Sequence, residues 1–188
     1  MESFLMSLGI VALAEMGDKT QLLALVLAAR FRKPAPIILG ILVATILNHG
    51  VAGALGAWLM HTIGPQWMRW ILGGSFLAMA GWILVPDKLD DAQAEQKGGI
   101  FLTTVIAFFL AEMGDKTQFA TVALAAQYSS LTAVVLGTTF GMMVANVPAV
   151  LLGDRVTRLV PMRTVHLIAA GLFVILGLMA LFNVGSLL

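Results

Sequence analysis

The sequence predicts an all-α, polytopic membrane protein whose six transmembrane helices form two inverted three-helix repeats. Its composition is the first indication. Hydrophobic residues make up 60% of the 188 positions and charged residues only 11%, whereas a soluble domain carries about 25% charged residues. The second is an exact repetition. The octapeptide Ala-Glu-Met-Gly-Asp-Lys-Thr-Gln occurs at residues 14–21 and 111–118, an offset of 112 − 15 = 97 residues.

Six apolar stretches are long enough to cross a bilayer, which takes about 20 residues. They are residues 4–29, 35–60, 67–85, 100–126, 131–153 and 162–184. Each half of the chain holds three of them, so the second half enters the membrane from the opposite side and the repeat is inverted. We therefore divide the chain into a first repeat at 1–85, a cytoplasmic linker at 86–99 and a second repeat at 100–188.

The distribution of Lys and Arg predicts the orientation, because cytoplasmic loops carry an excess of positive charge. One face receives Arg30, Arg32, Lys33, Lys88, Lys97, Arg155, Arg158 and Arg163. The other receives only Arg69. The first face is therefore predicted to be cytoplasmic, with both termini on the opposite side. The chain has no cysteine, which excludes disulfides and thiolate metal sites.

The charged residues of the two octapeptides are predicted to meet inside the membrane. Glu15 and Asp18 are three residues apart and would share one face of a continuous helix, as would Glu112 and Asp115. From Asp18 to the end of the apolar stretch at Ala29 is 29 − 18 = 11 residues, about 16 Å of helix. Half of the hydrocarbon core is about 15 Å. Both motifs therefore fall near the midplane.

Charge counting favours a divalent cation as the ligand of these groups. Four carboxylates and two lysines sum to −2, and either one divalent ion or two protons bring the sum to zero. Carboxylate and amide oxygens suit Mg²⁺, Ca²⁺ or Mn²⁺. The predicted metal ligands are Glu15, Asp18, Glu112, Asp115, Gln21 and Gln118. No ATP-binding motif is present, so an ion gradient is expected to drive any transport.

Several motif residues allow two interpretations. Glu15 and Lys19 have the spacing of an ion pair within one helix. Lys19 and Lys116 are otherwise expected to hold the carboxylates apart or to carry protons. Gly17 and Gly114 indicate either an unwound turn that exposes carbonyl oxygens or close helix packing.

Residues outside the charged pairs are secondary candidates. His49 and Asn146 are repeat-equivalent, because 146 − 49 = 97. His49 either carries a proton or is a packed core histidine, and Asn146 either adds an oxygen to the site or bridges helices. Met16 and Met113 offer thioethers, although packing is the better interpretation. His166 lies near a predicted span end and is expected to be interfacial.

The doubled Glu-φ-Gly-Asp-Lys-Thr, where φ is hydrophobic, resembles the signature motif of the Gdt-type cation/proton exchangers. This family includes Golgi manganese/calcium exchangers, chloroplast manganese transporters and bacterial manganese exporters, and the compact chain looks most like the last. The resemblance implies export of Mn²⁺ from the cytoplasm coupled to protons. Together with the Lys and Arg distribution, it leads us to expect a bacterial inner membrane with both termini in the periplasm. It implies ion binding by the four acids and supporting roles for Lys19, Thr20, Lys116 and Thr117.

Other functions remain as alternatives at this point. Ca²⁺/H⁺ exchange, or a broader divalent cation exchange, needs the same oxygen ligands. A passive cation channel would need an open pore. An intramembrane metalloenzyme is disfavoured, because the chain has no His-Glu-x-x-His motif. We expect no enzymatic activity, no cofactor and no nucleic acid partner. The expected partners are the divalent metal ion and membrane lipid, and a homo-oligomer stays open.

Overall fold

The computed structural model describes residues 1–85, 99–152 and 162–182, and every regular element in these ranges is a helix. The predicted linker at 86–99, apart from Gly99, and the predicted span ends at 153 and 183–184 lie outside the described residues. The helices are α1 (Glu2–Glu15), α2 (Lys19–Phe31), α3 (Pro34–Ile63), α4 (Pro65–Trp82), α5 (Ile100–Glu112), α6 (Lys116–Gln127), α7 (Leu131–Leu152) and α9 (Met162–Phe182).

The predicted first and fourth spans are not continuous helices, which corrects the sequence-based expectation. α1 ends at Glu15 and α2 begins at Lys19, while α5 ends at Glu112 and α6 begins at Lys116. Gly17 has φ = 82° and Gly114 has φ = 75°, a left-handed conformation that glycine adopts without steric cost. These two glycines therefore break the helices, rather than serving only to let helices pack closely.

Three of the described helices are long and apolar enough to cross a membrane by themselves. They are α3, α7 and residues 163–182 of α9, while α5 is a shorter apolar helix. Apolar side chains cover much of the outer surface, including Trp58 and Trp67 near the end of α3 and the start of α4. Such a surface suits contact with lipid.

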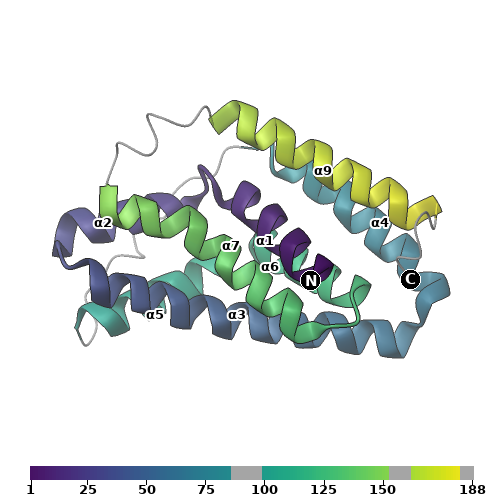
Figure 1. Ribbon diagram of the computed structural model, residues 1–188, viewed down its shortest axis with the longest axis horizontal. Coiled ribbons are helices and arrows are strands. Elements are labelled where there is room, and N and C mark those ends of the chain that lie inside the picture. Colours follow the sequence, from purple (N-terminus) through teal and green to yellow (C-terminus); the bar gives the residue numbers. More distant parts are fainter. Residues whose placement is uncertain (86–98, 153–161, 183–188) are drawn as a thin grey trace.

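The helix order of the first half recurs in the second (Figure 1). α1, α2, α3 and α4 correspond to α5, α6, α7 and α9 at the offset of 97 residues, as Lys19 and Lys116 illustrate at the starts of α2 and α6. The halves interleave, since α1 packs along α7 and α5 along α3. α6 likewise packs on α3, and α2 on α7. This exchange brings the two broken helices side by side.

Glycines allow the closest of these contacts. A Cβ atom at Gly141 of α7 would lie 2.6 Å from the Leu8 carbonyl oxygen of α1. A Cβ at Gly40 of α3 would lie 2.6 Å from the Thr104 Cβ of α5. Both distances are too short for a real Cβ atom, so each of these two helix contacts requires glycine. Small residues are typical of close contacts between membrane helices.

Two apolar clusters stabilise opposite ends of the bundle. One joins α4 and α9 with α1 and α6 and includes Phe76 and Phe173, whose rings lie 6.2 Å apart. The other joins α2, α3, α5 and α7 and includes Leu27 and Phe108. The polar residues of the two helix breaks lie between these clusters along the chain.

Candidate metal-binding site

The two helix breaks have nearly the same backbone geometry. Asp18 has φ, ψ of −78°, 166° and Asp115 has −84°, 164°, so each aspartate is extended and precedes the next helix. The Asp18 N–H donates to the Glu15 carbonyl and the Asp115 N–H to the Glu112 carbonyl, both at 3.0 Å. The predicted common helical face of each Glu–Asp pair is therefore wrong, because the glutamate ends one helix and the aspartate begins another.

The two motif glutamines hold these breaks in place. The Gly17 N–H donates to Gln21 Oε1 at 3.0 Å, and the Gly114 N–H donates to Gln118 Oε1 at 2.7 Å. Gln21 Nε2 donates to the Ala145 carbonyl of α7 at 3.0 Å. The side-chain oxygens predicted as metal ligands thus accept hydrogen bonds from glycine, and the metal-binding role of Gln21 and Gln118 stays a prediction.

Asn48 of α3 is a polar residue of the site that the sequence analysis missed. Its Oδ1 accepts from Gln118 Nε2 at 3.2 Å, and its Nδ2 donates to the Phe109 carbonyl of α5 at 3.1 Å. Asn48 therefore joins both parts of the second broken span. The sequence signal that could have identified Asn48 is a polar amide beside His49 within an apolar stretch.

The motif threonines each fix one oxygen of a buried glutamate. Thr20 Oγ1 donates to Glu15 Oε2 at 2.5 Å, and Thr117 Oγ1 donates to Glu112 Oε2 at 2.8 Å. The second oxygen of each glutamate, Oε1, is buried and has no hydrogen-bond partner in the described part of the chain. A hydrogen bond to one oxygen orients the carboxylate and directs the other toward the cluster interior.

The motif lysines pair between the two halves. Lys19 Nζ lies 3.0 Å from Asp115 Oδ1, and Lys116 Nζ forms an ion pair with Asp18 Oδ1. Lys19 therefore reaches the second break rather than Glu15 of its own half. Each lysine neutralises the aspartate of the opposite repeat, which links the two breaks electrostatically.

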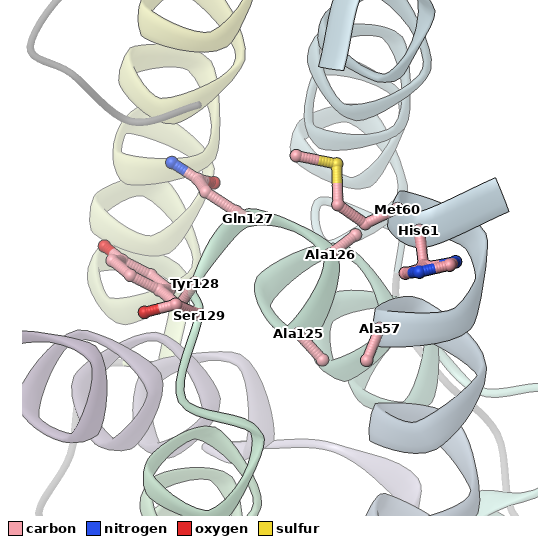
Figure 2. Close-up of a pocket in the computed structure, with 8 residues that line it drawn as sticks. All are labelled: Ala57, Met60, His61, Ala125, Ala126, Gln127, Tyr128 and Ser129. Atoms are coloured by element: carbon pink, nitrogen blue, oxygen red, sulfur yellow. The ribbon is translucent and has the colours of Figure 1, made fainter. Parts of the chain in front are cut away.

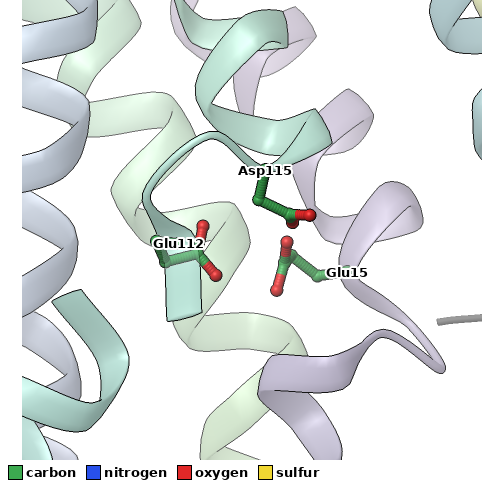
Figure 3. A group of neighbouring side chains, drawn as sticks. All are labelled: Glu15, Glu112 and Asp115. Carbon is green, nitrogen blue, oxygen red and sulfur yellow. The ribbon is translucent and has the colours of Figure 1, made fainter. Parts of the chain in front are cut away.

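Three carboxylates converge between the breaks, as Figure 3 shows. Glu15, Glu112 and Asp115 each offer an oxygen within 4.8 Å of the others. All three are buried, and Asp115 Oδ2 also lacks a hydrogen-bond partner among the described residues. At 4.8 Å and an effective dielectric constant of about 20, two like charges repel by about 3.5 kcal/mol. Such oxygens suit a hard divalent cation or protons.

The remaining candidates lie outside this group of three. Asp18, the fourth predicted acid, is engaged by Lys116. His49 is fully buried, and neither ring nitrogen has a hydrogen-bond partner within the described ranges. Asn146 Nδ2 donates to the Met142 carbonyl of its own helix at 3.1 Å. Met113 has a 60% exposed side chain, which favours contact with its surroundings over metal binding.

His166 is not merely interfacial, in contrast to expectation. Its Nε2 lies 2.6 Å from the Met16 carbonyl oxygen, inside the first helix break.

A separate cavity of about 380 Å³ lies between the ends of α3 and α6 (Figure 2). Met60, His61 and Gln127 are among its lining residues, and none of the clustered carboxylates lines it. The three clustered carboxylates are instead buried.

Comparisons with known proteins identify the family of this chain. The sequence profile described as divalent cation/proton antiporter GDT1 matches residues 3–91 and 100–186. A provisionally named manganese exporter of Vibrio cholerae is 50% identical over 94% of this chain and 88% of its own length. GDT1-like protein 5 of Arabidopsis thaliana is 28% identical over 96% of both chains.

A rice protein is also related, since GDT1-like protein 3 of Oryza sativa subsp. indica is 28% identical over 89% of this chain and 69% of its own length. No solved structure matches. The matched residues include both helix breaks and all the clustered carboxylates. The chain belongs to the divalent cation/proton antiporter GDT1 family, a family of integral membrane transporters.

Proposed function

We propose that this protein exports Mn²⁺ from the cytoplasm in exchange for protons, and that Glu15, Glu112 and Asp115 form the exchange site. The observation that carries this proposal is the convergence of three buried carboxylates, each of which also has one oxygen without a hydrogen-bond partner in the described ranges. Family membership supports proton exchange, and the Vibrio cholerae relative supports manganese as the cargo.

The ion pairs support an exchange of one divalent ion for two protons. Lys19 and Lys116 neutralise Asp115 and Asp18. Glu15 and Glu112 then carry the remaining two negative charges in a buried site, which is unfavourable inside a membrane. One Mn²⁺ or two protons bring the site to neutrality. Because both use the same oxygens, binding of one releases the other.

The proposed architecture counts each broken helix as one membrane crossing. α1 with α2 and α5 with α6 then give six spans in two inverted repeats, with both termini in the periplasm of a bacterial inner membrane. Non-helical backbone is tolerated at membrane depth where it is buried in protein or lines a water-filled route. The glutamine and histidine contacts of the two breaks support this arrangement.

Transport by the purified protein in liposomes tests the function. We expect radiolabelled Mn²⁺ to accumulate against its gradient only when an opposing pH gradient is imposed. Glu112→Gln should abolish this accumulation, because it removes one charge and one ligand. Glu2→Gln, a change at an exposed acid near the N-terminus, is the matched control and should transport normally. Wild-type transport by Glu112→Gln would contradict the site assignment.

Ca²⁺/H⁺ exchange is the second candidate, because an all-oxygen ligand set also suits Ca²⁺. Competition between the two ions in the same liposomes decides the preference. If Ca²⁺ at equal concentration displaces most of the labelled Mn²⁺ uptake, calcium is the favoured cargo. Accumulation driven by the pH gradient also excludes a passive channel, which can only equalise concentrations.

A further inference from the structure

The helix pair α4–α9 packs against only one end of the bundle. Among the described helices, α4 contacts α6 and, less extensively, α3, and α9 contacts α1, in addition to the extensive contact between α4 and α9 themselves. The apolar cluster that contains this pair includes residues of α1 and α6, while the cluster of α2, α3, α5 and α7 contains none of its residues. Figure 1 shows the pair lying along one side of the molecule.

The repeat relation predicts a second arrangement of the α4–α9 pair. α1 corresponds to α5, and α6 corresponds to α2, at the offset of 97 residues. The equivalent arrangement with the two halves exchanged would therefore place α9 on α2 and α4 on α5. Inverted-repeat transporters alternate access largely by moving one repeat or bundle against the other around a fixed site.

One contact distinguishes the two breaks. His166 of α9 reaches the Met16 carbonyl oxygen at 2.6 Å, where the end of α1 leaves a backbone acceptor without a helical partner. The repeat-equivalent of Met16 is Met113, because 16 + 97 = 113. The equivalent of His166 is Arg69 of α4, because 166 − 97 = 69. Both positions thus carry side chains that can donate a hydrogen bond.

Arg69 and Met113 do not make this contact in the structure. The Arg69 guanidinium lies 5.2 Å from the centre of the Trp70 ring, and its Nε has no hydrogen-bond partner in the described ranges. Met113 is 60% exposed. Within a membrane such a break must be covered by protein or by water, because lipid offers no hydrogen bonds. α9 reaches the first break, whereas at the second break the Met113 side chain is exposed and the neighbouring Glu112 and Asp115 are buried.

We propose that His166 and Arg69 are paired positioning residues that cap the Met16 and Met113 carbonyls alternately as the α4–α9 pair moves from one end of the bundle to the other. The clustered carboxylates are buried in the arrangement described here while Met113 is exposed, so exchange of the caps would change which break is covered by the pair rather than open the cluster itself. This proposal rests on the proposed transport function and adds to it the moving element and its two end contacts.

The interface between α4 and α9 suits movement as one unit. Gly73 and Gly177 allow the two helices to approach closely, since a Cβ at Gly177 would lie 3.0 Å from Leu77 Cγ and 3.1 Å from the Gly73 carbonyl oxygen. Tight packing at small residues holds membrane helices together. The pair can therefore move without separating, and the last turns of α3 must move with it, because Gly64 alone joins α3 to α4.

Cysteine cross-linking in native membranes tests the alternation, and the absence of natural cysteines makes the background clean. The double variant Met16→Cys/His166→Cys should be captured by a short bifunctional thiol reagent in the arrangement described here. Arg69→Cys/Met113→Cys should be captured in the opposite arrangement. Arg69→Cys/Met16→Cys joins non-equivalent breaks and should remain uncross-linked. Failure of the second pair to react, while the first reacts, would overturn the proposal.

Removing one cap should shift the population toward the other arrangement. With the Met16–His166 cysteine pair in place, Arg69→Leu should raise its cross-linking yield, and Arg69→Lys, which keeps a donor, should restore the original yield. A hydrogen bond contributes about 0.5–1.5 kcal/mol, so the ratio of the two arrangements should change about two- to tenfold. An unchanged yield would contradict the role of Arg69, whereas loss of packing alone would not be rescued by lysine.

These experiments separate the failure of this inference from the failure of the proposed function. Cross-linking is read without added manganese and needs no transport. If both pairs cross-link but no Mn²⁺ is carried, the movement stands and the cargo is wrong. If Mn²⁺ is exchanged for protons but the Arg69–Met113 pair never reacts, transport stands and this movement is wrong.

Discussion

Replacing Thr117 by valine should weaken manganese binding without disturbing the fold. The Thr117 hydroxyl donates to Glu112 Oε2 at 2.8 Å in a fully buried position. Valine keeps the shape of the side chain and removes only this hydrogen bond. A hydrogen bond to a charged group contributes about 1.5–3 kcal/mol, and each 1.4 kcal/mol is about tenfold in affinity. Groups that orient metal ligands typically change metal affinity by about 10- to 100-fold.

We therefore expect Thr117→Val to raise the KM for Mn²⁺ in liposomes by about 10- to 100-fold. Thr121→Val is a matched control on the same helix. Thr121 is also buried, but its hydroxyl donates to the Thr117 backbone carbonyl at 2.8 Å and touches no carboxylate. The control should leave KM unchanged. Equal KM values for the two variants would refute the idea that Thr117 orients the Glu112 carboxylate.

Four further predictions concern stability, pH and topology. Lys116→Met should lower the free energy of unfolding in detergent by about 3–5 kcal/mol, because Asp18 loses its lysine, and adding Asp18→Asn should restore much of this loss. Gly141→Ala should lower the melting temperature, because the new Cβ would lie 2.6 Å from a backbone oxygen. Gly9→Ala is the control and should not lower the melting temperature, because a Cβ at this position meets open space. The KM for Mn²⁺ should rise as the pH falls, since protons occupy the same oxygens. Reporter enzymes fused to either terminus should show periplasmic activity, and a cytoplasmic signal would reverse the proposed orientation.

The sequence predicts the helical class and the meeting of the two motifs for a clear physical reason. Charged residues are costly in an apolar chain, and their exact repetition at 14–21 and 111–118 indicates a shared role. The convergence of Glu15, Glu112 and Asp115 in the structure agrees with that reasoning. Hydropathy located the three described helices that are long and apolar enough to cross a membrane, α3, α7 and most of α9.

The local geometry of the site could not be predicted in the same way. Glycine occurs both at helix breaks and at close helix contacts, so Gly17 and Gly141 look alike in sequence but act differently. Pairing of Lys19 with Asp115 depends on how the two halves interleave, which helical spacing does not encode. The contact of His166 with the first break likewise depends on where α9 packs.

The crossed lysines have a consequence for how such a chain can assemble. A half-length polypeptide ending at residue 85 would bring its own lysine and two acids into the bilayer. The lysine and the acids of the other half, which pair with them, would be missing. Only an antiparallel second copy, or the other half supplied separately, could provide them. Two co-expressed fragments should therefore reconstitute a working carrier, whereas a fragment expressed alone should persist only where two of its copies pair in antiparallel orientation.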